Sequence, residues 1–91
     1  MPEVTIRTFA TLKEIFGAEN IFNANEGMTV YACIEAFADA AHHRDVLFDE
    51  TGLKSHIILM YNRERIDAED AKELVIAEGD EYVLYPPVSG G

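Results

Sequence analysis

The chain has 91 residues, of which 17 are acidic and 7 basic, and its formal net charge is −10. This length supports one domain, and a hydrophobic content of 48% argues against intrinsic disorder. The acidic balance argues against binding to nucleic-acid phosphates or to anionic membranes and favours a partner with a basic surface. Cys33 is the only cysteine, so an intramolecular disulfide is excluded. The lone cysteine fits an intracellular protein, and the sequence shows neither a signal-peptide pattern nor an apolar run of membrane-spanning length, so we expect a cytoplasmic protein.

The chain begins with a pattern that predicts two strands joined by a short helix. Residues 4–9 place Val4, Ile6 and Thr8 on one face, which is typical of a strand rich in β-branched side chains. Residues 20–24 predict a second strand, antiparallel to the first. Between them, residues 10–16 carry apolar side chains at helical spacing, and the following glycine predicts where this helix ends.

One long helix is predicted after a turn at residues 25–28. Thr29 is a good N-cap candidate, because its hydroxyl can accept a hydrogen bond from a free backbone N–H of the first turn. The apolar residues that follow recur on one helix face: Val30, Ile34, Phe37, Ala38 and Ala41. We expect this helix to end near His42 and to cover a sheet. Cys33 lies beside its apolar face, so we interpret Cys33 as a buried core thiol rather than a catalytic one.

The second half of the chain predicts two or three further strands. Residues 43–55 indicate a polar loop whose few apolar side chains fold back onto the core. Residues 56–61 are apolar at both alternating sets of positions and predict a well-covered strand. Residues 65–67 predict a short return strand, and the acidic segment 68–73 is either helical or irregular. Residues 81–85 predict the last strand, and their adjacent apolar side chains place it inside the sheet.

This order of elements predicts an α+β domain over residues 1–85, in which one helix packs across a mixed sheet of four to five strands. Residues 86–91, Pro-Pro-Val-Ser-Gly-Gly, form a separate C-terminal tail. The two prolines fix φ and hold the chain extended as it leaves the last strand. The two glycines lack Cβ atoms, so a narrow channel of a partner can close around the tip. The tail therefore predicts a projecting arm that presents its α-carboxylate to another protein's active site.

Other conspicuous residues have structural interpretations. Three tyrosines are either a partner-facing patch on an uncovered sheet face or part of the core: Tyr61, Tyr82 and Tyr85. Three histidines lack the spacing of a metal site, so we expect no bound metal: His42, His43 and His56. An acidic run is interpreted as a solvated face: Asp67, Glu69, Asp70 and Glu73. The chain has no glycine-rich phosphate loop, so it is not expected to bind ATP or another cofactor by itself.

Several of these features together resemble a known family. The order of elements, the turn Gly79-Asp80-Glu81 before the last strand and the terminal Pro-Pro-Val-Ser-Gly-Gly are similar to the MoaD/ThiS family of ubiquitin-like β-grasp sulfur carriers. The likeness is strongest to MoaD, the small subunit of molybdopterin synthase. The short helix at residues 10–16 also resembles the family pattern. Two departures are Asn62-Arg63, where the family usually has Asn-Gly, and a looser segment at residues 67–77.

The resemblance implies a function for the tail. An E1-like or MoeB-like enzyme would use ATP to adenylate the Gly91 carboxylate, and a sulfur donor would convert the acyl-adenylate into a thiocarboxylate. The large subunit of molybdopterin synthase would then accept the tail for synthesis of the molybdenum or tungsten cofactor, so the chain would not be catalytic alone. Gly90 and Gly91 carry the chemistry in this scheme. The remaining residues of the site would contact partners: Tyr85, Pro86, Pro87, Val88 and Ser89.

Three alternatives stay open at this point. The chain is also consistent with a ubiquitin-like modifier whose Gly91 is joined to lysines of target proteins, either instead of sulfur transfer or in addition to it. A second alternative keeps the sulfur-carrier function but assigns it to the thiamine pathway instead of the molybdenum or tungsten cofactor. A plain interaction domain with an incidental tail is the third.

Overall fold

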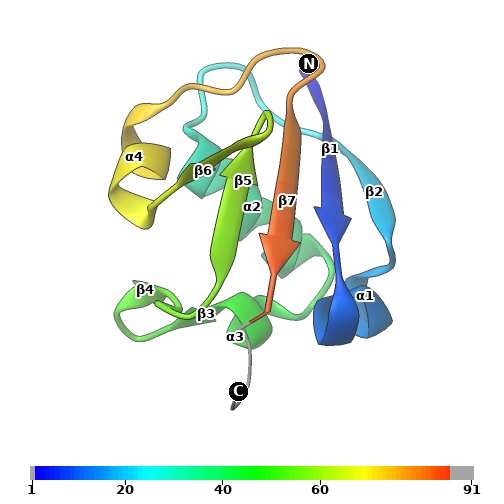
Figure 1. Ribbon diagram of the computed structural model, residues 1–91. Coiled ribbons are helices and arrows are strands. Elements are labelled where there is room, and N and C mark those ends of the chain that lie inside the picture. Colours follow the sequence, from blue (N-terminus) through cyan, green and yellow to red (C-terminus); the bar gives the residue numbers. More distant parts are fainter. Residues whose placement is uncertain (1, 87–91) are drawn as a thin grey trace.

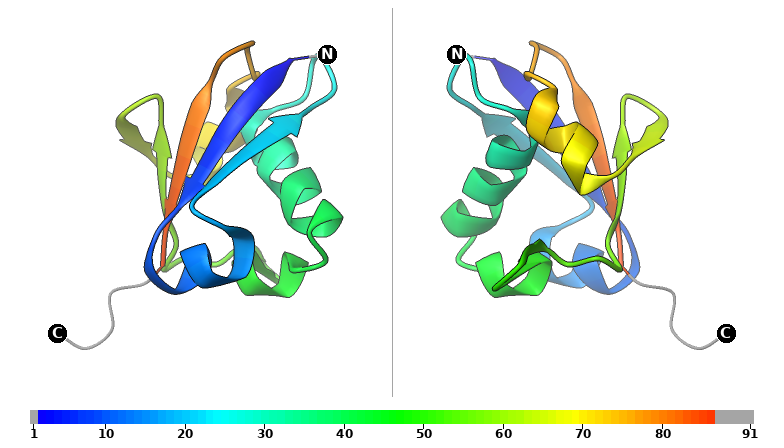
Figure 2. Two further views of the ribbon diagram at one scale, coloured as in Figure 1. Left: turned by 90° about the vertical axis from the view of Figure 1, so that its right-hand side faces the viewer. Right: turned by 90° about the vertical axis from the view of Figure 1, so that its left-hand side faces the viewer.

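The computed structural model describes residues 2–86 and shows a mixed five-stranded sheet with its helices on one face (Figure 1). The elements in chain order are β1 (Glu3–Thr8), α1 (Ala10–Phe16), β2 (Glu19–Asn23), α2 (Val30–Ala40), α3 (Arg44–Leu47), β3 (Phe48–Asp49), β4 (Gly52–Leu53), β5 (Ile58–Tyr61), β6 (Glu64–Ile66), α4 (Ala68–Glu73) and β7 (Glu81–Tyr85). Seen edge-on, α2 lies against one face of the sheet, and the other face carries no helix (Figure 2). The predicted α+β architecture is confirmed.

The strand order is β2-β1-β7-β5-β6, which places the last strand of the chain in the middle of the sheet. β7 is parallel to β1 and antiparallel to β5, and β2 is antiparallel to β1. Both the predicted pairing of the first two strands and the internal position of the last are confirmed. Because β7 is held on both sides, the point at which the tail leaves the domain is fixed by two neighbouring strands.

α2 buries its apolar face as the sequence predicts. The Thr29 hydroxyl accepts a hydrogen bond from the Ala32 N–H at 3.1 Å, so Thr29 is the N-cap. The helix ends at Ala40, earlier than expected, and the left-handed backbone of His42 (φ 63°) redirects the chain. The core between helix and sheet includes Val4, Ile6, Val30, Cys33, Ile34, Phe37, Leu59, Tyr82 and Leu84.

The loop expected at residues 43–55 contains the short helix α3 and the two-residue pairing of β3 with β4. Leu47 and Phe48 are buried, so the prediction that its apolar residues fold back is confirmed. Tyr31 of α2 fixes the hairpin, because its hydroxyl accepts the Leu53 N–H at 2.9 Å. Gly52 is required there: a Cβ atom would lie 2.5 Å from that hydroxyl, and its φ is 116°.

Two expectations about the later strands need correction. β5 begins at Ile58 rather than at residue 56, and only Leu59 of its four residues is fully buried. The expected coverage of both faces was wrong, because no helix or strand within residues 2–86 packs on the far side of the sheet. The segment 68–73 is a helix, α4, whose capping box pairs the Asp67 side chain with the Asp70 N–H and the Asp70 side chain with the Asp67 N–H.

The turn between β5 and β6 holds Arg63 where the family usually has glycine, and it gives a first prediction. Asn62 (φ 46°) and Arg63 (φ 74°) both have left-handed backbones, as a two-residue hairpin of this kind requires. A side chain at φ above zero is strained by about 1 kcal/mol, whereas glycine is not. We therefore expect Arg63→Gly to raise the free energy of unfolding by about 0.5–1 kcal/mol in urea titrations.

The matched control for this prediction is Glu64→Gly, one residue further along and inside β6. Glycine within a strand costs about 0.5–1 kcal/mol, so this variant should be destabilised instead. Equal losses in both variants would contradict the interpretation of the turn.

Candidate functional site

The candidate site begins where β7 ends, at Tyr85 and Pro86. The other predicted site residues, Pro87, Val88, Ser89, Gly90 and Gly91, lie outside the described part of the chain. The Tyr85 ring stacks on the Phe9 ring with centroids 4.9 Å apart and planes 9° from parallel. Both rings remain exposed, Phe9 at 42% and Tyr85 at 36%. Such a pair has the character of an interface anchor, because aromatic side chains are enriched at protein interfaces.

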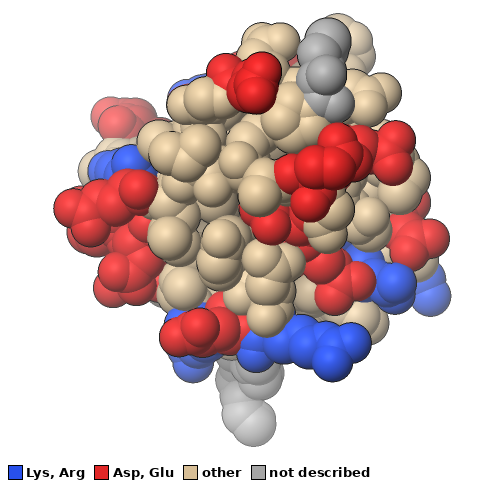
Figure 3. All heavy atoms as spheres, turned by 90° about the horizontal axis from the view of Figure 1, so that it is seen from above, with Lys and Arg blue, Asp and Glu red and all other residues tan. Residues whose placement is uncertain are grey.

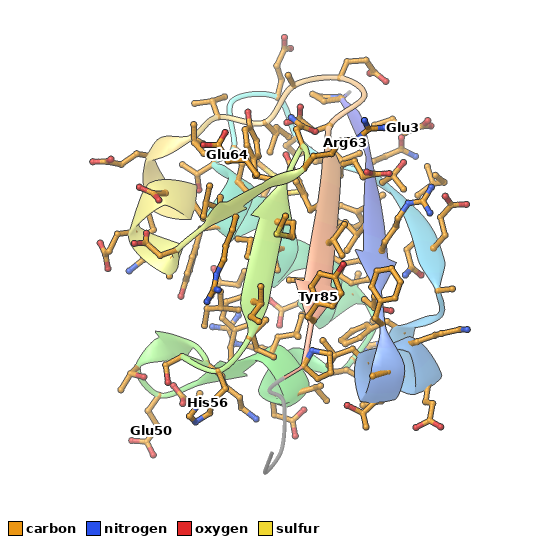
Figure 4. The ribbon with its side chains drawn as sticks, viewed as in Figure 1. Glu3, Glu50, His56, Arg63, Glu64 and Tyr85 are labelled. Carbon is orange, nitrogen blue, oxygen red and sulfur yellow. The ribbon has the colours of Figure 1, made fainter. Side chains whose placement is uncertain are left out.

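The aromatic pair belongs to a larger apolar surface on the sheet face that no helix covers. In the register of the sheet, Tyr85 is opposite Ile58 and Val83 is opposite Met60, and these residues alternate with the buried Leu84 and Leu59. We call the outward-facing set, in which Phe9 and Tyr85 are exposed and the other three residues are half-buried, the sheet-face patch: Phe9, Ile58, Met60, Val83 and Tyr85. Figure 4 shows Tyr85 on this open face, at the end from which the tail leaves. The end of β7 therefore lies beside an apolar surface of the kind that partners bind.

The structure resolves the two interpretations of the tyrosines. Tyr82 is fully buried, and half-buried Tyr61 stacks on it with centroids 5.9 Å apart, so both belong to the helix-covered face. Tyr85 alone of the three faces outward. Phe9 was not among the predicted site residues, although its place after Arg7 in the alternation already set it on the face opposite the core.

A buried polar cluster anchors the start of β7. Asp80 is only 6% exposed, and its carboxylate accepts hydrogen bonds from Asn62 Nδ2 (3.0 Å), the Ala77 N–H (2.9 Å) and the Tyr82 hydroxyl (2.8 Å). Burial and then the hydrogen bond to Asp80 raise the pKa of Tyr82 well above its usual range. In return, the Asn62 Oδ1 accepts the Glu81 N–H at 2.8 Å. The turn Gly79-Asp80-Glu81, singled out in the sequence, is thus hydrogen-bonded through Asn62 to the β5–β6 hairpin.

Charged side chains surround this site unevenly. On the open sheet face, Arg7 bridges Glu19 at 2.9 Å and Glu81 at 2.8 Å, although all three are substantially exposed. Exposed pairs of this kind contribute little to stability. Figure 3 looks onto the end of the molecule opposite the C-terminal end of β7, where acidic side chains form several clusters around an uncharged centre. Glu3 and Glu64 lie at this end (Figure 4).

The remaining candidates are the lone thiol and the possible metal ligands. Cys33 is fully buried, and burial, followed by the charge of Asp80, raises its pKa to about 11, so the thiol stays protonated at neutral pH. Within residues 2–86, no three His, Cys, Asp or Glu side chains gather as a metal site would need. No helix in that range has both the length and the apolar character to cross a membrane.

The fold, with its central β7 and the helix packed across one face of the sheet, defines a ubiquitin-like β-grasp protein. The ThiS family matches residues 6–91, and the chain belongs to this family. It is similar to small archaeal modifier protein 3 of Haloferax volcanii, with 28% identity over 98% of this chain and 99% of that protein. The chain is a ubiquitin-like small modifier or sulfur carrier of this family.

Solved structures agree on the fold. The crystal structure of SAMP1 from Haloferax volcanii has a TM-score of 0.83 and 29% identity, covering 98% of this chain and 99% of that one. A putative molybdopterin converting factor, subunit 1, from Pyrococcus furiosus has a TM-score of 0.73 and 19% identity, covering 97% of this chain and 100% of that one. At that identity the second likeness concerns the fold alone.

Proposed function

We propose that the Gly91 carboxylate is activated as an acyl-adenylate by an E1-like enzyme and then converted to a thiocarboxylate that donates sulfur. The observation that carries the proposal is that the central strand β7 ends beside the exposed rings of Phe9 and Tyr85 and is followed in the sequence by Pro-Pro-Val-Ser-Gly-Gly. A carboxylate resists nucleophiles because it is negatively charged and has no good leaving group. Adenylation supplies the leaving group, since AMP departs when the sulfur nucleophile attacks the carbonyl carbon.

The sheet-face patch supports a second role for this domain in the proposed reaction, which is to dock on the activating enzyme and position the tail. Phe9 and Tyr85 stack on each other and are exposed at the end of β7, so an activating enzyme that docks on them receives the tail at a defined distance. Once the domain is docked, the enzyme holds ATP and the tail in one complex. The effective concentration of the carboxylate that attacks ATP is therefore raised. In this scheme the chain supplies the substrate and its position, and the partner supplies the nucleotide site.

For the acceptor of the sulfur, we propose the molybdopterin precursor, delivered while this chain is the small subunit of a molybdopterin synthase. This step is supported by the MoaD-like residues Pro-Pro-Val-Ser-Gly-Gly. A second candidate is a protein modifier in which a lysine amine of a target protein attacks the activated Gly91 carbonyl, releases AMP and forms an isopeptide bond. The likeness to a small archaeal modifier protein over nearly the whole chain favours this candidate.

The intact mass of the protein isolated from its own cells tests these proposals. Replacement of one terminal oxygen by sulfur would support the carrier, and Gly-Gly remnants on lysines of other proteins in the same lysate would support the modifier. Both signals together would indicate a dual role. If cells grown with and without molybdate yield neither species, activation of Gly91 is refuted.

A further inference from the structure

Pro86, which follows β7, lies beside a second apolar surface, at the end of the domain that carries α1 and α3. A hollow of about 170 Å³ lies among α1, α3 and the segment before β5, and Pro86 forms part of its wall. Its apolar walls include Ile15, Val46 and Ile57. Ile15 is 40% exposed, so the apolar surface is open to the outside. We call this hollow the tail-root pocket. An apolar cavity of about this volume holds a ligand the size of benzene.

The charged side chains of the pocket are unusual for this protein. Its charged or titratable members are Lys54 and His56, and no Asp or Glu lines it, although the chain has 17 acidic and 7 basic residues. Lys54 is half-buried, and its backbone is held on both sides, by the bonds Lys54 N–H to Leu47 O (2.9 Å) and Ile57 N–H to Lys54 O (3.0 Å). His56 lies at the end of the molecule from which the tail leaves (Figure 4). The pocket therefore suits a ligand with one apolar side chain and one carboxylate.

The five residues that follow Pro86 meet this description. Val88 is their only branched aliphatic residue, and Gly91 carries the α-carboxylate. Val88 is two residues beyond Pro86, so it reaches at most about 7 Å from it, and Gly91 reaches about 17 Å. Because Pro86 is itself part of the pocket wall, both distances are sufficient for the tail to turn back on its own domain. The two terminal glycines allow the backbone to reverse direction.

From this pocket, its charges and the length of the tail, we infer that the tail docks on its own domain before a partner takes it. Val88 occupies the tail-root pocket, and the Gly91 carboxylate pairs with Lys54. The docked tail is not available to an activating enzyme, so its affinity for that enzyme is reduced by the docked fraction. This regulatory consequence rests on the proposed function, whereas the docking itself does not.

Methyl NMR on the full-length free protein tests the docking. Nuclear Overhauser contacts between the Val88 methyls and the methyls of Ile15 and Val46 are expected, and Val88→Ser should shift the Ile15 and Val46 signals. The exposed Ile21 methyl on β2 is the internal control and should not move. Absence of these contacts together with unchanged Ile15 signals in Val88→Ser would overturn the inference. Contacts seen only between differently labelled molecules would also overturn it, in favour of docking on a second copy.

The charge pair has its own matched test. Lys54→Gln should lower the ratio of docked to free tail about twofold to fivefold, which is the effect of one exposed ion pair, and added salt should act in the same direction. Lys13→Gln removes an exposed lysine of α1 that does not line the pocket and should leave the ratio unchanged. Equal effects of the two variants would refute the pairing with Lys54. These measurements need no activating enzyme, so a failure to find activated Gly91 in cells would count against the proposed function alone.

Discussion

Removing Gly91, or adding one alanine after it, is expected to abolish transfer from the tail while the domain stays folded. Either change moves the reacting carboxylate by about 3.5 Å along the chain. A misplacement of about 1 Å in a held reactant can cost 100-fold in rate, so we expect a loss of at least about 100-fold. The measurement is formation of the adenylate, thiocarboxylate or conjugate, followed by intact mass.

The control for this prediction is an alanine inserted after Met1, which lengthens the chain by the same amount but leaves the tail unchanged. Urea unfolding should give the same midpoint for all of these variants, because the core of the domain ends with β7. An extended tail that still gives normal yields of the activated product would show that Gly91 is not the reacting residue.

Replacing Asp80 by alanine is expected to cause the largest loss of stability among single substitutions in the polar part of the fold. The change removes the acceptor of three hydrogen bonds and leaves the hydroxyl of fully buried Tyr82 without its partner. Loss of one side of such a buried cluster costs about 3–5 kcal/mol. This is a large part of the 5–15 kcal/mol that stabilises an ordinary domain. Urea or thermal unfolding followed by circular dichroism measures the change.

Tyr82→Phe is the matched control, because it removes one donor and keeps the Asp80 carboxylate with its bonds to Asn62 and Ala77. We expect a loss of about 1 kcal/mol for this variant. If Asp80→Ala were no less stable than Tyr82→Phe, the cluster would not be what holds the start of β7.

The sequence predicted those parts of the fold in which local pattern and burial agree. Alternation in β1 placed Val4 and Ile6 in the core, helical spacing placed Ile34 and Phe37 there, and Thr29 was found as the N-cap. The adjacent apolar residues of β7 predicted its position inside the sheet. The prediction for β5 failed because alternation cannot show whether a second layer covers the far face of a sheet.

The sequence alone determined that this is an α+β domain, because the alternating strand patterns and the one amphipathic helix can be read locally. Only the tertiary structure decided which tyrosine faces a partner, because Tyr82 and Tyr85 lie on opposite faces of the same strand. It alone brought Phe9 onto Tyr85 and placed Lys54 and Ile15 around Pro86, since these residues are far apart in the chain. Such contacts follow from strand pairing and helix packing over long sequence distances, which no local pattern encodes.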